Sequence, residues 1–160
     1  MDRVSEPTYF EGDIIITDPC YIMKDNKDWD KCDCGDHLEL LGIEHFMTRD
    51  TIYGDWSCTV FDLNNKHEEL GEFCADAGRV SVILLDDVLR YNPNFNYHTE
   101  RPWTTTLIRD FKGTVQFVIK EDKYEYDGEP KVEYEVEVVG HGVNIRAGNP
   151  IDFLGRQTGF

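Results

Sequence analysis

Thiol, imidazole and carboxylate groups gather in the segment 32–37, which has the sequence CDCGDH. It places three soft or borderline metal ligands within six residues, and a fourth could come from Cys20, Cys58 or Cys74. Structural zinc sites usually contain cysteine pairs separated by about two to four residues. This chain has no such pair, so we interpret the segment as a polar loop with incidental thiols rather than as a zinc site.

Carboxylates in the same region partly match a calcium-binding loop. Counting from Asp28, acids stand at positions one, three, nine and twelve of an EF-hand, namely Asp28, Asp30, Asp36 and Glu39. The sixth position, where an EF-hand needs glycine for its sharp turn, is Asp33. We therefore expect neither zinc nor calcium in stoichiometric amount, and no other cofactor.

Two arrangements could support catalysis. Cys20 follows a predicted strand, and its thiolate could pair with His98 or His141 as base. Asp18 and Asp76 could act as general acid and base. No nucleophile elbow accompanies the cysteine, and each aspartate stands beside a turn-forming residue, where Asp usually bonds to nearby backbone. We name no catalytic residue, and whether the protein is an enzyme stays open, with a non-enzyme favoured.

Glutamates alternate with apolar residues over the segment 131–139. In a strand, Glu133, Glu135 and Glu137 share one face and lie about 6.6 Å apart, twice the rise of ~3.3 Å per residue. A DNA strand carries a phosphate every ~3.4 Å, so mimicry of DNA needs a second acidic row, for which Glu121, Asp122 and the adjoining turn are candidates. The alternative is a solvated face that nearby lysines partly neutralise. The candidate partner-binding residues are Glu121, Asp122, Glu133, Glu135 and Glu137.

Two short segments oppose the negative charge of the chain. Residues 101–109 hold two arginines and no acid, and residues 140–160 hold two arginines and one acid. Arginine together with aromatic rings suits a nucleotide or another small phosphate ligand. The alternative is that these arginines pair with carboxylates nearby. For the nucleotide interpretation the candidate ligand-binding residues are His98, Arg101, Trp103, His141, Arg146 and Arg156.

The formal charge of −16 over 160 residues is the strongest signal in the composition. Phosphates repel such a chain, so we expect no direct binding to nucleic acid, whereas basic partners are attracted. An acidic surface also keeps a small protein in solution, which is the plainer explanation. The sequence has neither an apolar run of membrane length nor a secretory leader, so we expect a cytoplasmic protein with reduced thiols and no membrane partner.

A β-rich fold must position these groups. β-branched residues predict a first strand over 11–17, which Asp18-Pro19 ends because Pro19 restricts the residue before it. Alternating or apolar runs predict three more strands over 56–61, 70–74 and 80–85, with tight turns between them. The second of these turns is Asp76-Ala77-Gly78.

The remaining elements are an antiparallel meander and short helices. Three strands over 104–111, 114–121 and 131–139 are expected, with turns at Lys112-Gly113 and at 126–130. One helical turn is expected around Trp29, and a short helix is expected to begin at Asp86 as N-cap. We therefore predict one domain over 1–160, mainly β (α+β), built as an antiparallel sheet or sandwich with one or two short helices.

Three of these landmarks resemble a known family. A strand that runs from Gly12 to Asp18-Pro19, a tryptophan strand at Trp56, and Asp76-Ala77-Gly78 before another strand are similar to bacterial and phage proteins grouped as a domain of unknown function. The resemblance covers roughly residues 10–90 and departs from the family in Cys20-Tyr21 and in the long acidic loop. It implies a β-rich fold and a phage or mobile-element origin, and it implies no chemistry.

Together these observations favour a non-enzymatic acidic binding or inhibitor protein of phage or mobile-element type. It would occupy a basic, nucleic-acid-binding surface of a host protein in the host cytoplasm, as anti-CRISPR-like inhibitors do. The alternative is a small-ligand-binding protein that sequesters a nucleotide signal, and a hydrolase of unknown type is the third interpretation. The sequence leaves the oligomeric state open.

Overall fold

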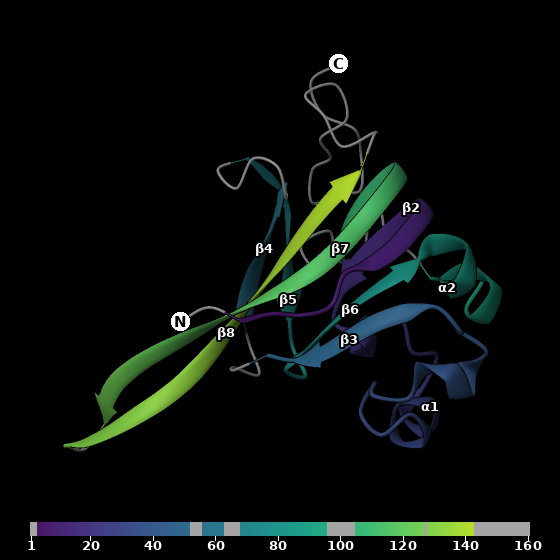
Figure 1. The fold of residues 1–160 in the computed structure, drawn as a ribbon. Coiled ribbons are helices and arrows are strands. Elements are labelled where there is room, and N and C mark those ends of the chain that lie inside the picture. Colours follow the sequence, from purple (N-terminus) through teal and green to yellow (C-terminus); the bar gives the residue numbers. More distant parts are fainter. Residues whose placement is uncertain (1–2, 52–55, 63–67, 96–104, 127, 143–160) are drawn as a thin grey trace.

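The computed structural model describes residues 3–51, 56–62, 68–95, 105–126 and 128–142, with the backbone alone described in parts of the strands. In these residues eight strands form one sheet with the order β3-β6-β2-β7-β8-β4-β5, and β1 pairs with β7 beside this path (Figure 1). The strands are β1 (Arg3–Val4), β2 (Thr8–Thr17), β3 (Phe46–Asp50), β4 (Trp56–Asp62), β5 (Glu69–Ala75), β6 (Arg79–Leu84), β7 (Thr105–Tyr126) and β8 (Glu129–Gly142). The helices are the 3-10 turns η1 (Pro19–Tyr21) and η2 (Leu38–Leu41), and the α-helices α1 (Asn26–Lys31) and α2 (Leu85–Tyr91).

The strand pairing is antiparallel in every described pair except β4 with β8, which is parallel. The prediction of a mainly antiparallel β fold with short helices is therefore confirmed. The sequence did not predict β3 or the parallel pair. No helix in the described residues is long and apolar enough to cross a membrane.

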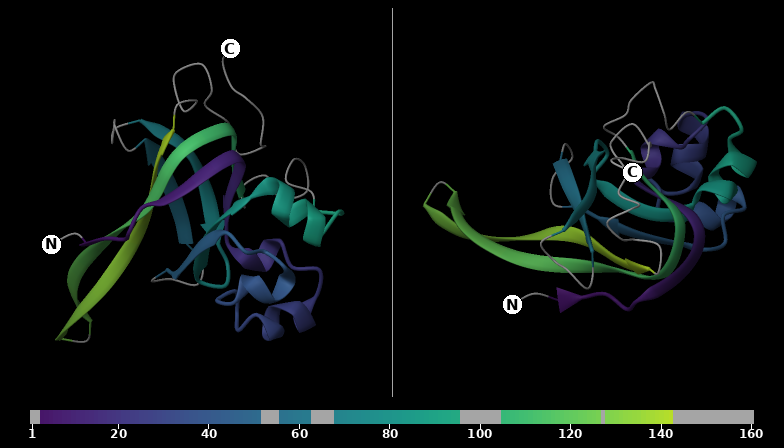
Figure 2. Two further views of the ribbon diagram at one scale, coloured as in Figure 1. Left: turned by 45° about the vertical axis from the view of Figure 1, so that its right-hand side comes forward. Right: turned by 90° about the horizontal axis from the view of Figure 1, so that it is seen from above.

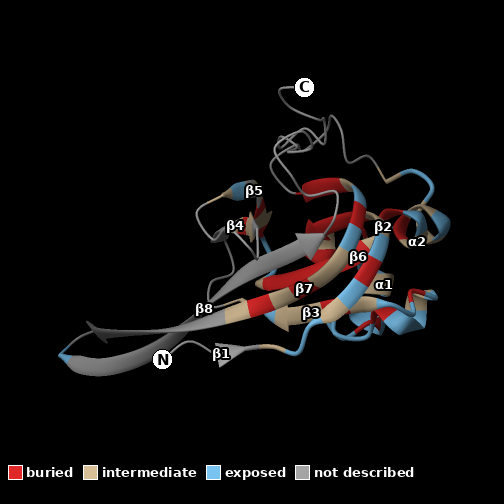
Figure 3. Ribbon diagram, turned by 45° about the horizontal axis from the view of Figure 1, so that its top comes forward, coloured by how far each residue is buried: buried red, intermediate tan, exposed pale blue. Residues whose placement is uncertain are grey.

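The core lies where β2, β6 and the first half of β7 run side by side (Figure 3). Ile14, Ile15 and Ile16 of β2 are at most 1% exposed, so both faces of this strand are covered. β6 is buried at every position from Arg79 to Ile83, so both of its faces are covered as well. This densely packed region is the rigid core of the fold, and the loops connect its strands.

The three strands predicted over 56–85 are present, but they do not stay together. β4 pairs with β5, whereas β6 lies between β3 and β2 near the other end of the strand order. Because the turn 76–78 is only three residues long, the end of β5 and the start of β6 lie close in space although the two strands are far apart in the strand order. The sheet also curls so that β5 approaches β7, and a Cβ at Gly71 would lie 2.6 Å from Thr106 Cγ2.

The turn predicted at Lys112-Gly113 is wrong, because β7 continues through it. β2 pairs with β7 from Thr105 to Val115, and the register of this pairing shifts between Gly12 and Ile14. Asp110 has a φ of 52°, and its N–H donates to Asp13 Oδ1 at 2.9 Å. A bulge thus bends the strand where the sequence suggested that it turns.

Beyond its first half, β7 forms a long ribbon with β8. The two strands pair from Gly113 opposite Gly142 to Tyr126 opposite Glu129, where Gly128 has the positive φ of 80° that a tight turn requires. In the described residues, positions 120–137 pair only across this ribbon. Figures 1 and 2 show the ribbon projecting from the body as an arm. We call residues 120–137 the hairpin arm.

The predicted helices are present, with one correction. α1 surrounds Trp29 as expected, and Asn92 ends α2. Asp86 is not the N-cap of α2: the helix begins at Leu85 after Leu84, whose side chain makes no capping bond, and Asp86 lies in its first turn. The helix starts earlier because Leu85 and Val88 are buried against the sheet, so packing fixes the start.

Candidate functional site

A buried carboxylate joins two of the sequence landmarks. Asp18, between β2 and η1, has 0% of its surface exposed. Its Oδ1 accepts the N–H of Cys20 at 3.1 Å. Its Oδ2 accepts the N–H groups of Asp76 (3.0 Å) and Ala77 (2.8 Å) from the turn that follows β5, and that of Arg79 (3.2 Å) at the start of β6. Four backbone donors replace the water that burial removes, which is the usual requirement for a buried carboxylate.

Residues 25–39, which we call the acidic lobe, pack against Pro19, the next residue of this junction. Gly35 is buried with a φ of +89°, and a Cβ there would lie 2.5 Å from Pro19 Cγ and 3.1 Å from Trp29 Cζ3. Only glycine combines this backbone angle with so close an approach. Within the lobe, Asp25 Oδ1 accepts the N–H of Asp28 at 2.9 Å and caps α1.

The nearly buried side chain of Arg79 also binds the acidic lobe. This side chain is 9% exposed, and its guanidinium lies 3.2 Å from Asp36 Oδ1 of the lobe and 2.6 Å from Asp50 Oδ1 of β3. It also donates to Thr48 Oγ1 at 3.1 Å. A nearly buried guanidinium with two carboxylates and a hydroxyl has partners enough to offset its desolvation.

The end of α2 holds the lobe from a third direction. The Tyr91 hydroxyl donates to Asp28 Oδ2 and accepts the N–H of Lys24 at 3.1 Å. Asn92 Nδ2 donates to the carbonyl of Ile22 at 3.0 Å. Burial, and then the hydrogen bond to Asp28, raise the pKa of Tyr91 above its ordinary value. The acids of the lobe are therefore presented by an anchored segment.

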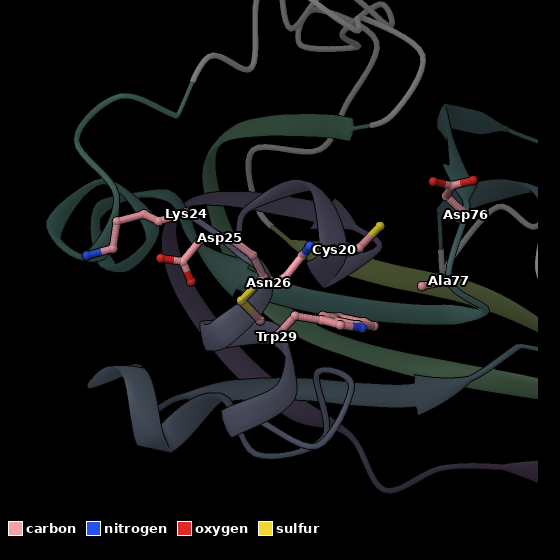
Figure 4. A pocket seen from close by; sticks show the side chains of 8 residues that line it. Cys20, Lys24, Asp25, Asn26, Trp29, Asp76 and Ala77 are labelled. Atoms are coloured by element: carbon pink, nitrogen blue, oxygen red, sulfur yellow. The ribbon is translucent and has the colours of Figure 1, made fainter.

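A pocket of about 350 Å³ lies between the lobe and the turn after β5 (Figure 4). Cys20 and Trp29 form one side, and Asp76 with Ala77 forms the other. The remaining lining residues are Met23, Lys24, Asp25 and Asn26. Asp18 holds the backbone of the Asp76 side, and the Trp29 ring lies beside Gly35, which packs on Pro19, so both walls adjoin the Asp18-Pro19 junction.

The electrostatics of the junction disfavour the thiolate chemistry that was considered for Cys20 and not adopted. Burial, followed by the charge of Asp18, raises the pKa of the Cys20 thiol far above its ordinary value. Burial, followed by the charge of Asp76, likewise raises the pKa of the Tyr21 hydroxyl. A nucleophilic cysteine needs the opposite shift. Asp18 has both oxygens engaged by backbone N–H groups, so it acts as a structural tie rather than as a general acid or base.

The potential metal ligands of 32–37 do not gather as a thiol site. Cys32 is buried in the core and Cys34 is exposed. In the part of the chain that the structure describes, the ligand atoms lying within 4.8 Å of one another belong to Asp33, Asp36 and His37, all exposed. Asp36 already pairs with Arg79.

The register of the hairpin arm places the predicted partner-binding residues. Glu133 lies opposite Asp122 and Glu135 opposite Lys120, while Glu121 lies opposite Tyr134. Opposed residues share a face of a β-ribbon and neighbours along a strand alternate. The glutamate row therefore has Asp122 beside it, whereas Glu121 belongs to the other face and does not extend a second acidic row.

The predicted nucleotide site falls almost entirely outside the described residues. His98, Arg101, Trp103, Arg146 and Arg156 lie outside them. His141 is placed by its backbone alone, opposite Thr114 of β7.

The pocket between Trp29 and Asp76 was not predicted from the sequence. Trp29 was expected in a helical turn and Asp76 in a tight turn, but nothing in the local sequence connects positions 47 residues apart. Comparison of the chain with protein-family models, curated proteins and solved structures found no match. The arguments about function therefore rest on the site itself.

Proposed function

We propose that this chain is a non-enzymatic acidic binding protein whose surface occupies a basic, nucleic-acid-binding surface of a host protein. One observation carries the proposal: an anchored lobe presents a set of exposed carboxylates. Five of its acids are exposed, namely Asp25, Asp30, Asp33, Asp36 and Glu39. The lobe as a whole holds six acids against two lysines. Carboxylates that are already in place lose little conformational freedom on binding, which favours affinity for a complementary basic surface.

Two further observations favour binding over catalysis. Asp18 is engaged by four backbone N–H groups, and the neutral thiol of Cys20 is favoured by burial and by the nearby carboxylate. We further propose that Glu133, Glu135 and Glu137 on β8 provide a second acidic surface. The phage or mobile-element origin remains the implication of the sequence resemblance, and with it the inhibition of a host protein.

The test asks whether a column of this protein retains basic proteins and whether nucleic acid then elutes them. The protein is immobilised, bacterial lysate is applied at low salt, and the column is eluted with a short DNA duplex or with sodium chloride of matched ionic strength. We expect DNA to release a retained nucleic-acid-binding protein more completely than salt does, because both compete for one surface.

Charge reversal gives the control for this experiment. Asp30→Lys with Glu39→Lys changes two exposed acids of the lobe, and Glu6→Lys with Glu44→Lys changes two exposed acids elsewhere by the same charge. We expect the lobe pair to lose the DNA-released protein and the control pair to keep it. Equal loss of the retained partner in both pairs would mean that net charge alone retains it. A partner that salt elutes but DNA does not would contradict competition with nucleic acid.

A further inference from the structure

The pocket between the acidic lobe and the turn after β5 has the size of a site for one side chain. Its volume of about 350 Å³ is at the lower end of the range for small-molecule sites. Trp29, on α1, and Asp76, in the turn, line opposite sides of the pocket, so an entering group has an aromatic residue on one side and an exposed acidic residue on the other (Figure 4). Such a pair of walls suits a planar cation.

The basic residue at the rim does not compete for this space. Lys24 Nζ lies 4.7 Å from the centroid of the Tyr91 ring, and Figure 4 shows its side chain directed away from Trp29 and Asp76. Asp25, also at the rim, directs an oxygen to the N–H of Asp28 and caps α1. The charge at the opposite wall is therefore that of Asp76, which is exposed.

The backbone of one wall is held without a ligand, because the N–H groups of Asp76 and Ala77 bind the buried carboxylate of Asp18. On the other wall the Trp29 ring lies beside Gly35, where the lobe packs on Pro19. A cation entering the pocket would have to order the exposed side chain of Asp76 but not the backbone that carries it, which reduces the cost of binding.

The surroundings of the pocket are negative. The carboxylates of Asp18 and Asp76 contribute to the raised pKa of both Cys20 and Tyr21, after the larger effect of burial. A phosphate group would be repelled there, whereas a cation would be attracted. The Cys20 thiol, neutral at physiological pH for the same reason, offers an uncharged polarisable wall.

We propose that this pocket receives an arginine side chain of the basic partner, with the guanidinium stacked on Trp29 and paired with the carboxylate of Asp76. A guanidinium fits both walls because its plane stacks on an aromatic face while its N–H groups bind a carboxylate in pairs. A lysine ammonium provides neither the plane nor the fork. The identity of the carrier rests on the proposed function, whereas the chemistry of the pocket does not.

The probe is N-acetyl-L-arginine amide, titrated at physiological salt and followed through the backbone amide signal of Ala77 by NMR. We expect a saturable shift. N-acetyl-L-citrulline amide, a neutral molecule of nearly the same shape, should bind about tenfold more weakly because it lacks the charge that pairs with Asp76. N-acetyl-L-lysine amide should also bind more weakly than the arginine probe.

Variants locate the binding. Asp76→Asn keeps the size of the side chain and should weaken the arginine probe about fivefold or more, and Trp29→Leu should do so as well. Asp33→Asn removes an exposed charge of the lobe outside the pocket lining and is the matched control, expected to change the affinity less than about twofold. A melting curve like that of the parent chain confirms that each variant is folded.

Several results would overturn the assignment. They are the absence of a saturable shift, equal binding of the citrulline or lysine probe, and equal weakening by Asp33→Asn and Asp76→Asn. Any of these, with DNA-released retention intact on the column, would reject the arginine pocket and leave the proposed function standing. If the parent chain shows a specific arginine shift but retains no protein that DNA releases, the arginine pocket stands and the proposed function is rejected.

Discussion

Asp18 and the carboxylates of the acidic lobe are the same chemical group in opposite surroundings. Asp18 is fully buried and accepts four backbone N–H groups, so its charge joins two distant segments. Asp30 and Asp33 are exposed on the anchored lobe, so their charges face solvent. The comparison teaches that burial and backbone donors, rather than residue type, separate a structural acid from an acid that is accessible to the proposed partner.

The largest effect should come from neutralising the buried acid. Asp18→Asn keeps the shape but replaces one accepting oxygen with an amide that donates, which leaves backbone N–H groups unsatisfied in the core. We expect the free energy of unfolding to fall by about 3–5 kcal/mol, measured by urea denaturation. Asp30→Asn is the matched control and should change it by less than about 0.5 kcal/mol. Equal effects would abolish the distinction between the two kinds of acid.

The next effect tests whether the lobe is docked through Gly35. Gly35→Ala places a Cβ 2.5 Å from Pro19 Cγ, whereas Gly42→Ala, at a similar φ of +84°, meets nothing within 4 Å. Both changes carry the cost of a left-handed backbone, about 1–2 kcal/mol. We expect Gly35→Ala to lower the free energy of unfolding by about 1–3 kcal/mol more, the cost of overpacking. Equal losses at the two positions would mean that the lobe is not tightly seated.

Much of the local structure at this junction could be predicted from the sequence. Pro19 ended the first strand as expected, Trp29 anchored a helical turn, and Asp76-Ala77-Gly78 formed a turn before a buried strand. These features depend on short-range backbone preferences, which a single sequence carries.

The site could not be predicted because it depends on pairing across the sheet. The hydrogen bonds that Asp18 accepts from the N–H groups of Asp76 and Ala77 exist because β6 pairs with β2 instead of with β5. The position of Glu121 depended on strand pairing in the same way. A shift of one residue in register moves a residue to the other face of the ribbon, and the observed register places Glu121 opposite Tyr134 rather than opposite a glutamate of the row. Lys112-Gly113 carried turn chemistry, yet pairing with β2 kept β7 continuous.

A smaller effect concerns the tie between α2 and the lobe. Because the pKa of Tyr91 is raised in the folded chain, folding favours its neutral form. This stability is complete below the ordinary value of 10.0 and is lost as pH rises above it, since the unfolded chain then ionises first. The limit is about 1.4 kcal/mol per pH unit, and partial exposure should keep the slope below it.

The measurement compares the parent chain with Tyr91→Phe. The free energy of unfolding should decline less steeply above pH 10 in the variant, while the two slopes should agree between about pH 6 and 8. Identical slopes above pH 10 would show that Tyr91 is not the titrating group. A constant offset at all pH values is expected from loss of the hydrogen bond to Asp28 and does not bear on this test.

The smallest effect on stability is expected from the glutamates of the hairpin arm. Reversal of Glu133, Glu135 and Glu137 to lysine improves the opposition to Asp122 but places like charges opposite Lys120. These changes offset each other, so the free energy of unfolding should move by less than about 0.5 kcal/mol. If the row contributes to the proposed interface, the same variant should lose DNA-released retention on the column.

Reversal of Glu6, Glu11 and Glu44, three exposed acids outside the arm, provides the same change in charge and should keep DNA-released retention. Retention equal in both triple variants would assign the row to solvent and leave the acidic lobe as the binding surface. A large fall in stability would instead show that these carboxylates, like Asp18, hold the fold together.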